Sequence, residues 1–183
     1  MRVRIVGAPS LLVGVISDTH DNLALARRAG EIFARERVEA VIHLGDYVAP
    51  FTLAELLGVV GGKAVFYGVF GNNDGERLGL SRVAGGFGAS LLDPPATVSI
   101  GGRRLLLLHG FGSPENTVEL VDALASSGRW DAVLYGHTHK ARVERVGGSL
   151  VLNPGDGGGS LEKPSAAILD LESMEARLVS LEG

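Results

Sequence analysis

The sequence predicts an α/β fold, and three observations support this prediction. Apolar runs of strand length alternate with a helical pattern over residues 12–69, which is typical of a parallel sheet. From residue 97 onward, short alternating runs and glycine turns indicate mostly antiparallel strands. The chain has 183 residues, 45% of them hydrophobic and 21% charged, which are the size and composition of one globular domain. We therefore expect a single α/β domain spanning residues 1–183.

The first half of the chain predicts strands that alternate with helices. Residues 12–17 form a continuous apolar run, as in a strand buried on both faces. Asn22 is a plausible N-cap for a helix that ends near Arg37. Its apolar stripe consists of Leu25, Ala29, Ile32 and Phe33 at i, i+4, i+7 and i+8. We expect further elements in this half as a strand at 38–44, a short helix at 50–57 that starts with Pro50, and a strand at 63–69.

The second half predicts a hairpin, one helix and several antiparallel strands. Gly101-Gly102 is a turn signal between strands at 97–100 and 103–108, and Pro114 starts a helix through about Ser127. Residues 79–88 are rich in glycine and poorly periodic, so we expect no regular element there. We expect strands at 131–135, 141–146, 149–153, 165–171 and 176–181, with residues 155–160 as a flexible glycine loop.

Composition excludes several classes of protein. The chain has no cysteine, which rules out disulfides, thiolate metal sites and a cysteine nucleophile, and which suits a reducing compartment. Seventeen Lys and Arg against 21 Asp and Glu give a net charge of -4, so binding of long nucleic acid is not expected. Apolar runs such as 105–108 are far shorter than the roughly 20 residues of a spanning helix. We expect no membrane insertion.

The N-terminus resembles the start of a signal peptide but predicts a strand instead. Arg2 and Arg4 precede the apolar residues 11–16, yet no small-residue cleavage site follows. Cleavage there would also remove the polar residues 17–20, which are candidates for chemistry. We therefore expect a cytoplasmic protein.

Polar side chains gather where predicted strands end. Four of the five histidines directly follow buried strands: His20, His109, His137 and His139. Asp46 and Asn72 stand at the same place after the second and third strands. Ligands bind at the carboxyl ends of strands in open α/β sheets, so we expect these groups to converge on one crevice. Imidazole and carboxylate are natural ligands of manganese, zinc, iron or nickel.

The motifs Asp18-x-His20 and His137-x-His139 strengthen the prediction of a metal site. Donors two residues apart in an extended segment point the same way, so each pair can hold one ion. Together with Gly45-Asp46, Gly71-Asn72-x-Asp74 and His109, their order resembles the calcineurin-like metallophosphoesterase superfamily. The spacing agrees, because residues 21–44 and 47–70 give 24 residues between successive motifs. The resemblance covers residues 12 to about 155 and includes Asn153-Pro154-Gly155.

The resemblance implies both a fold and a function. The fold would be two mixed β-sheets packed as a sandwich and flanked by helices, a four-layer αββα arrangement. Small size points to the bacterial and archaeal phosphodiesterase branch, which hydrolyses a small phosphate ester by in-line attack of a metal-bridging hydroxide. Two divalent ions per chain are expected, with manganese favoured and zinc, iron or nickel as alternatives. A homodimer or homotetramer stays open.

The resemblance also assigns the metal ligands, residue by residue. One metal would be held by Asp18, His20, Asp46 and His139. The second would be held by Asp46, Asn72, His109 and His137, so that Asp46 bridges the two ions.

Two positions depart from the family pattern. Many members have histidine where this chain has Asn73, and a histidine there can protonate the leaving oxygen. Asn73 is the expected catalytic residue here, since its amide can donate a hydrogen bond to a phosphoryl oxygen without transferring a proton. The small branch often reads His-Gly-His where this chain has His109-Gly110-Phe111.

Other polar residues near the motifs have less specific expected roles. His43 is expected to be buried in support of the site rather than in contact with it, and Asp74 to brace its own loop. Asp21 either caps the following helix, together with Asn22, or accepts a hydrogen bond from a ligand imidazole, and the cap is favoured. Asp156, where the family usually has serine, either tightens metal binding or faces solvent.

The alternative to an enzyme is an interaction module that kept the fold and lost catalysis. Such a module has no need of seven ligand-type residues in register, and all seven are present. A nuclease acting on long DNA is disfavoured by the net charge and the small size. Trp130 and Tyr135 are expected in the core and at its rim rather than in a base-stacking surface.

Overall fold

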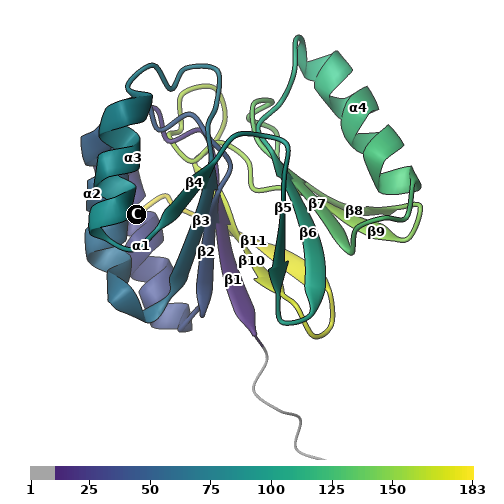
Figure 1. Cartoon of the computed structure of the whole chain (residues 1–183), viewed down its shortest axis with the longest axis horizontal. Coiled ribbons are helices and arrows are strands. Elements are labelled where there is room, and N and C mark those ends of the chain that lie inside the picture. The colour runs from purple at the N-terminus through teal and green to yellow at the C-terminus, as the bar shows by residue number, and fades with distance from the viewer. Residues whose placement is uncertain (1–10) are drawn as a thin grey trace, which may run out of the picture.

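Two mixed β-sheets lie face to face in the computed structural model, which describes residues 11–183 (Figure 1). The first sheet has six strands in the order β11-β10-β1-β2-β3-β4. Strands β1 to β4 are parallel, whereas β10 and β11 are antiparallel. The strands are β1 Leu12–Ile16, β2 Ala40–His43, β3 Val65–Val69, β4 Ser90–Leu92, β10 Ser165–Asp170 and β11 Glu175–Ser180.

The second sheet has five strands in the order β5-β6-β7-β9-β8. Its centre, β6, β7 and β9, is parallel, and its edges are antiparallel. The strands are β5 Ala96–Ile100, β6 Arg103–Leu108, β7 Ala132–Tyr135, β8 Arg142–Val146 and β9 Ser149–Asn153.

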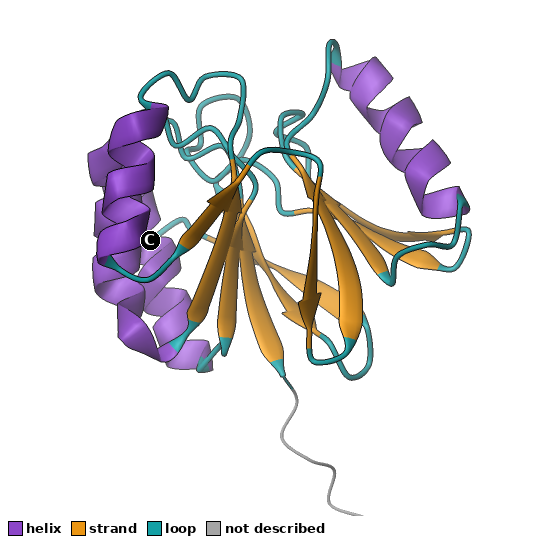
Figure 2. Cartoon of the chain, viewed as in Figure 1, coloured by secondary structure: helices purple, strands orange, loops and turns teal. Residues whose placement is uncertain are grey.

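Helices cover the outer face of each sheet, which gives four layers (Figure 2). Three helices lie on the first sheet: α1 Leu23–Glu36, α2 Pro50–Val60, extended by the 3₁₀ turn η1 Gly61–Lys63, and α3 Arg77–Gly86. Helix α4 Pro114–Ser126 covers the second sheet. The predicted αββα sandwich is therefore confirmed.

The central strands read as unbroken apolar runs because both of their faces are buried. Val13 and Val15 of β1 point toward the second sheet, where they join Leu105 and Leu107 of β6 in one cluster. Ile16 packs on the other side, under the helices. Full burial of each such side chain contributes roughly 1.5–3 kcal/mol. Tyr135 is buried and Trp130 partly buried in a third cluster beneath α4, as expected for core and rim residues.

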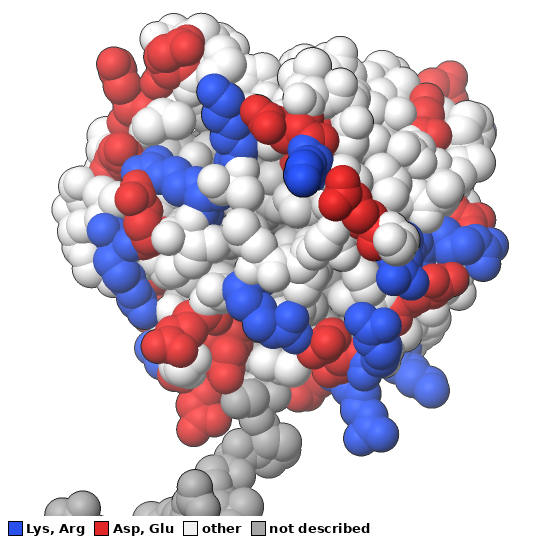
Figure 3. All heavy atoms as spheres, turned by 180° about the vertical axis from the view of Figure 1, so that it is seen from behind, with Lys and Arg blue, Asp and Glu red and all other residues white. Residues whose placement is uncertain are grey.

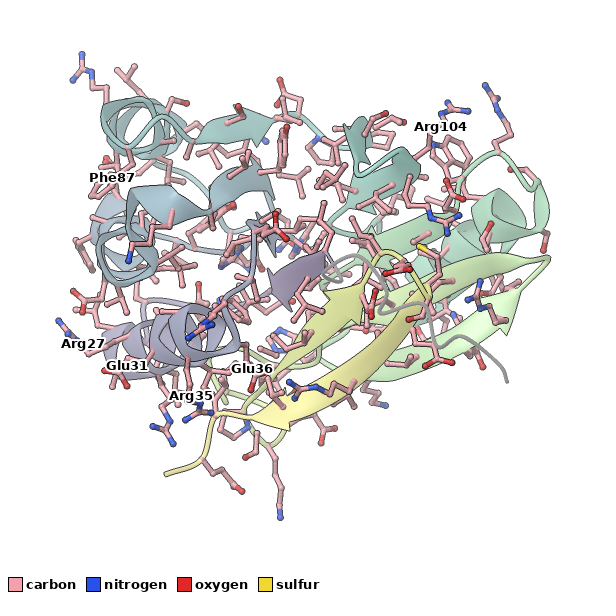
Figure 4. All side chains as sticks on the ribbon, turned by 90° about the horizontal axis from the view of Figure 1, so that it is seen from below. Arg27, Glu31, Arg35, Glu36, Phe87 and Arg104 are labelled. Atoms are coloured by element: carbon pink, nitrogen blue, oxygen red, sulfur yellow. The ribbon has the colours of Figure 1, made fainter. Side chains whose placement is uncertain are left out.

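Helix α1 shows how local signals fix the ends of an element. The side chain of Asn22 accepts a hydrogen bond from the N–H of Leu25, which confirms it as the N-cap. Phe33 fits against β1 because Gly14 has no Cβ, which would otherwise meet the ring at 2.6 Å. On the outer side of the helix, Figure 4 shows Arg27 and Glu31 pointing away from the sheet.

The prediction of no regular element at residues 79–88 is wrong. Helix α3 Arg77–Gly86 covers most of this stretch, and it buries only Leu80 and Ala84, one turn apart. Gly79 lets α3 approach α2, since a Cβ there would meet Pro50 Cγ at 2.6 Å. Glycine at this position serves close packing rather than a loop.

Residues 155–160 form a loop beside the strand ends, as predicted, and this loop is hydrogen-bonded to the rest of the fold. The N–H groups of Gly157 and Gly158 donate to the carbonyls of Ser17 and Asp18, at 2.9 and 2.8 Å. A Cβ on Gly157 would meet the Ser17 carbonyl oxygen at 2.4 Å. The glycines let this segment pack directly against the loop that follows β1.

The N-terminal apolar run forms strand β1, as predicted. Arg2 and Arg4 lie outside the described residues. Within residues 11–183, none of the helices combines the length and the apolar character needed to cross a membrane.

Candidate metal centre

The loops at the carboxyl ends of five strands meet between the two sheets, at the top of Figure 1. Strands β1, β2 and β3 of the first sheet lead to Asp18 and His20, to Asp46 and to Asn72, respectively. Strand β6 of the second sheet leads to His109, and β7 leads to His137 and His139. All seven predicted ligands come together there, as the convergence argument predicts.

Asp18, His20 and His139 form a first group with room for a cation. Asp18 Oδ1 lies 3.9 Å from Nε2 of His20 and 3.7 Å from Nε2 of His139, and the two rings are stacked. Asp18 Oδ1 and His20 Nε2 are buried and have no hydrogen-bond partner among the described residues. Unpaired buried polar atoms are costly, so their convergence fits a bound cation.

His109, His137 and Asn72 form a second group. Nδ1 of His109 donates to the Leu44 carbonyl at 2.7 Å, and Nε2 of His137 donates to the Gly112 carbonyl at 2.9 Å. In neutral rings the remaining nitrogens therefore carry lone pairs. Both face Asn72 Oδ1, at 3.0 Å from His109 and 2.9 Å from His137. A divalent cation among these three atoms would turn the repulsion into ligation.

Asp46 connects the two groups. Its Oδ2 lies 3.6 Å from His20 Nε2 and 3.4 Å from His109 Nε2. Although burial opposes ionisation, hydrogen bonds from His109 and from Asn73 hold the pKa of Asp46 well below its usual range. A carboxylate that stays charged between both groups is suited to share two metals.

Burial and neighbouring charges also shift the pKa values of two other groups of the centre. Burial raises the pKa of Asp18, against the opposing effect of His109. Burial would lower the pKa of His109, but Asp46 and Asp18 raise it above its ordinary value. Without a cation, a proton on His109 therefore compensates part of the negative charge.

Asn73 lies against Asp46 with both of its nitrogens. Its backbone N–H donates to Asp46 Oδ1 at 2.8 Å, and its Nδ2 donates to Asp46 Oδ2 at 2.7 Å. One amide hydrogen is thus used to hold a ligand, and only the second is left for another acceptor.

Asp74 braces its own loop, as predicted, and also the loop after β2. Its buried carboxylate accepts from the backbone N–H groups of Asp46, Val48 and Gly71, at 2.9, 2.9 and 2.7 Å. The loops after β2 and β3 are thereby tied to each other. This fixes the relative positions of Asp46 and Asn72.

The prediction that Asp21 caps α1 is wrong. Its Oδ1 accepts from Ala49 N at 2.9 Å and from Thr52 Oγ1 at 2.8 Å, at the start of α2. That helix begins with Pro50 and its N-cap residue Ala49 offers no side-chain oxygen, so Asp21 supplies the missing acceptor from the neighbouring loop.

His43 is fully buried and supports the site from behind, as predicted. Its Nε2 donates to Thr19 Oγ1 at 3.1 Å while its Nδ1 accepts from Gly45 N at 3.2 Å. Burial, together with the nearby His109, lowers the pKa of His43 to about 3. The neutral ring thus links the loops that carry Asp18 and Asp46.

Asp156 is fully buried, which excludes the one of the two alternatives in which it faces solvent. Its Oδ2 lies 3.1 Å from Nδ1 of His139. Although burial opposes ionisation, His139 and the backbone N–H groups of Leu161 and Glu162 lower the pKa of Asp156. In return, Asp156 raises the pKa of His139.

The backbone around the ligands adopts an uncommon conformation. Five of the seven ligand residues have left-handed φ angles between 41° and 68°, namely Asp18, His20, Asp46, His137 and His139. Such angles are rare outside glycine and recur at functional sites.

Two groups that orient the histidines leave no mark in the amino-acid sequence. The carbonyls of Leu44 and Gly112 hold the rings of His109 and His137, respectively. Every residue has a backbone carbonyl, so no residue type marks this role. Thr19, which holds His43, could have been noticed from its place between Asp18 and His20.

Known proteins share both the sequence and the fold. The family model of the calcineurin-like phosphoesterase superfamily domain matches residues 11–174. Phosphodiesterase MJ0936 of Methanocaldococcus jannaschii is 37% identical over 172 residues, 93% of this chain and 99% of the relative. Phosphodiesterase YfcE of Escherichia coli K12 is 31% identical over 153 residues, 76% of this chain and 75% of the relative.

A solved structure of an archaeal phosphodiesterase matches with a TM-score of 0.80 at 36% identity and covers 92% of this chain and 99% of its own. The family resemblance predicted from the motifs is thus confirmed over most of the chain. The protein belongs to the calcineurin-like phosphoesterase superfamily, among its small phosphodiesterases.

Proposed function

We propose that the protein is a phosphodiesterase that works with two divalent metal ions held by the seven converging residues. Asp18, His20, Asp46 and His139 would bind one ion, and Asp46, Asn72, His109 and His137 the other. The observation that carries this proposal is the position of Asp46, whose Oδ2 lies within 3.6 Å of a histidine nitrogen in each group.

Two bound divalent ions would activate water at neutral pH and neutralise the phosphoryl oxygens. The residues of the chain would hold these ions and the substrate in place. Asp46 would keep the two ions together, and Asn73 would hold Asp46 through one amide hydrogen while its second hydrogen binds a phosphoryl oxygen. Asn73 has no proton to transfer, so the proposal favours substrates with good leaving groups.

We propose manganese as the native metal and the cytoplasm as the location. The ligand set contains only nitrogen and oxygen atoms, which suits manganese, while zinc, iron and nickel compete for the same donors. A chain without cysteine suits a reducing compartment.

The proposed substrate is a small phosphodiester rather than long nucleic acid. The net charge is -4, and long nucleic acid is normally gripped by a positively charged surface. On the face seen in Figure 3, Lys and Arg lie interspersed with Asp and Glu instead of forming a continuous basic tract.

Reconstitution of the metal-free protein tests the proposal. Chain stripped by a chelator is loaded with Mn²⁺, Zn²⁺, Fe²⁺ or Ni²⁺ and assayed on monoesters, diesters and cyclic nucleotides. We expect about two ions per chain by elemental analysis and the highest activity on a diester with Mn²⁺. Asp46→Asn is the matched control, because it keeps the size of the side chain and removes the shared charge.

An interaction module of the same fold would behave differently in this assay. It would show no metal-dependent hydrolysis of any ester even when fully loaded. Two bound ions without turnover on any ester of the panel would therefore contradict the proposed enzyme.

A further inference from the structure

His139 has a carboxylate partner on the side of its ring that faces away from the centre. Its Nε2 lies 3.7 Å from Asp18 Oδ1, while its Nδ1 lies 3.1 Å from Oδ2 of Asp156. The exposed fraction of Asp156 is 0%. The contact is an ion pair rather than an aligned hydrogen bond, since Nδ1 has no partner in hydrogen-bond geometry among the described residues. A buried carboxylate this close favours a proton on Nδ1 and so leaves Nε2 to bind a metal.

The protein holds Asp156 in place independently of His139. Oδ2 of Asp156 also accepts from the N–H groups of Leu161 and Glu162, at 2.7 and 3.0 Å. Its backbone carbonyl accepts from Ser165 N at 3.1 Å, at the start of β10. The loop between β9 and β10, tied to the start of β10, thus presents a fixed negative charge to a histidine that follows β7.

The other ligand rings with a described partner on their remote nitrogen have a neutral one. His109 and His137 each donate to a backbone carbonyl, that of Leu44 and of Gly112. A carboxylate is a stronger acceptor than a carbonyl and makes the opposite ring nitrogen a better donor to a metal. His139 should therefore be the strongest of these three imidazole ligands.

The two groups also differ in the charge of their other ligands. The group around His139 contains the carboxylates of Asp18 and Asp46, with Asp156 behind the ring. The group around His109 contains Asp46 and the neutral amide of Asn72, and Asp18 Oδ1 lies 3.9 Å from His109 Nε2, as far as it lies from His20 Nε2. The carboxylate of Asp156 behind His139 and the neutral amide of Asn72 beside His109 both favour a cation on the His139 side.

We infer that Asp156 is a positioning residue that acts through His139 and makes the Asp18–His20–His139 side of the centre bind metal more tightly than the Asn72 side. This inference rests on the proposed function, since it presumes that both groups bind metal.

Calorimetric titration of the metal-free protein with Mn²⁺ tests the inference without any assay of activity. The wild type should bind two ions in two distinguishable steps. Asp156→Asn keeps an oxygen for the N–H groups of Leu161 and Glu162 but removes the charge. We expect it to weaken the tighter step by about 10- to 100-fold and to leave the weaker step within a few-fold. Asp156→Ser should do the same.

Two controls separate this role from a general loss of charge or structure. Asp131→Asn removes a carboxylate at the opposite end of β7, where it accepts from Arg104 N, and should leave both binding steps unchanged. In a His139→Ala background, Asp156→Asn should weaken binding no further, because its effect passes through the imidazole. Circular dichroism on every metal-free variant checks that each one folds.

The outcomes distinguish the inference from the proposed function. Equal weakening of both steps, or an additional loss from Asp156→Asn in the His139→Ala background, would overturn the role of Asp156. The role of Asp156 would also be overturned if Asp156→Asn and Asp156→Ser both bound the two ions with the affinities of the wild type. A folded wild type that fails to bind two ions would instead overturn the dinuclear site itself.

Discussion

The two sheets contribute different chemistry to the same centre. The loops of the first sheet supply both ligand carboxylates, the amide of Asn72 and one imidazole, whereas the loops of the second sheet supply three imidazoles. The first half is braced internally, since Asp74 ties the loops after β2 and β3 together. The charged ligands thus come from one sheet and most of the neutral ligands from the other.

The second half is oriented largely by the first. His109 donates to the carbonyl of Leu44, and the N–H of His137 donates to Asp18 Oδ2 at 3.0 Å. The sheets come so close that a Cβ on Gly136 would meet Ser17 Oγ at 2.0 Å. The comparison teaches that the centre depends on how the sheets pack, because neither sheet alone can place all the ligands.

Removal of the shared charge should have the largest effect. Asp46→Asn is expected to lower kcat/KM by far more than the 10- to 100-fold that is typical when a residue supporting a metal ligand is lost. The loss should also exceed that of Asp18→Asn, because Asp46 serves both groups. Steady-state assays on metal-saturated variants measure the difference. Equal and mild losses in the two variants would show that Asp46 does not bridge.

The second-largest effect is expected from the removal of Asp74, which ties the loops after β2 and β3 together. Asp74→Ala leaves three backbone N–H groups without their carboxylate acceptor, which should lower the free energy of unfolding by about 3–5 kcal/mol. Urea denaturation of the metal-free protein measures it. Asp93→Ala is the control, since it removes only an exposed ion pair with Arg77 and should cost less than about 1 kcal/mol. If Asp74→Ala lowers the free energy of unfolding as little as Asp93→Ala does, the loops are held by other contacts.

The role of Asn73 can be sharpened with a series of leaving groups. Without a general acid, the rate should depend steeply on leaving-group pKa, so a nitrophenyl diester should react much faster than an alkyl one. Asn73→His restores a group that titrates near neutral pH and should speed the poor substrate by about 100-fold, more than the good one. If the dependence is shallow and unaffected by the substitution, another group already donates the proton.

The buried His43 should make stability depend on pH. Its pKa is about 3 in the folded protein and near 6.5 in the unfolded chain, so the unfolded state binds a proton that the native state does not. Stability should therefore fall as the pH drops below about 6.5, by about 2 kcal/mol between pH 7 and pH 5. In denaturation experiments on metal-free His43→Gln, the free energy of unfolding should fall less steeply as the pH drops, because the glutamine does not titrate. Parallel curves for the two proteins would contradict the neutral buried ring.

Regular elements could be predicted wherever hydrophobic period and turn signals agree. Strand β1, the N-cap Asn22 and the Gly101-Gly102 hairpin are of this kind. Helix α3 could not be predicted, because two buried residues and three glycines leave almost no helical pattern. Its stability comes from packing against α2, which the local sequence does not encode.

The ligands could be predicted because strand ends converge, whereas their supports could not. Asp156 reaches His139 only through the path of a glycine-rich loop that packs on the loop after β1. Asp21 likewise serves a helix that begins almost thirty residues later. Such contacts depend on the packing of distant loops, which leaves no periodic signal in the chain.

The left-handed backbone at five of the seven ligands has a consequence for local opening. Each such residue lies roughly 1 kcal/mol or more above its preferred conformation, so these loops hold their shape only while the surrounding contacts hold them. In metal-free protein, amides near Asp18, Asp46 and His139 should exchange with deuterium well before those of β1 or β6, and metal should slow them selectively. The ligand loops would then open together while the two sheets stay packed, so metal could enter and leave without unfolding of the core.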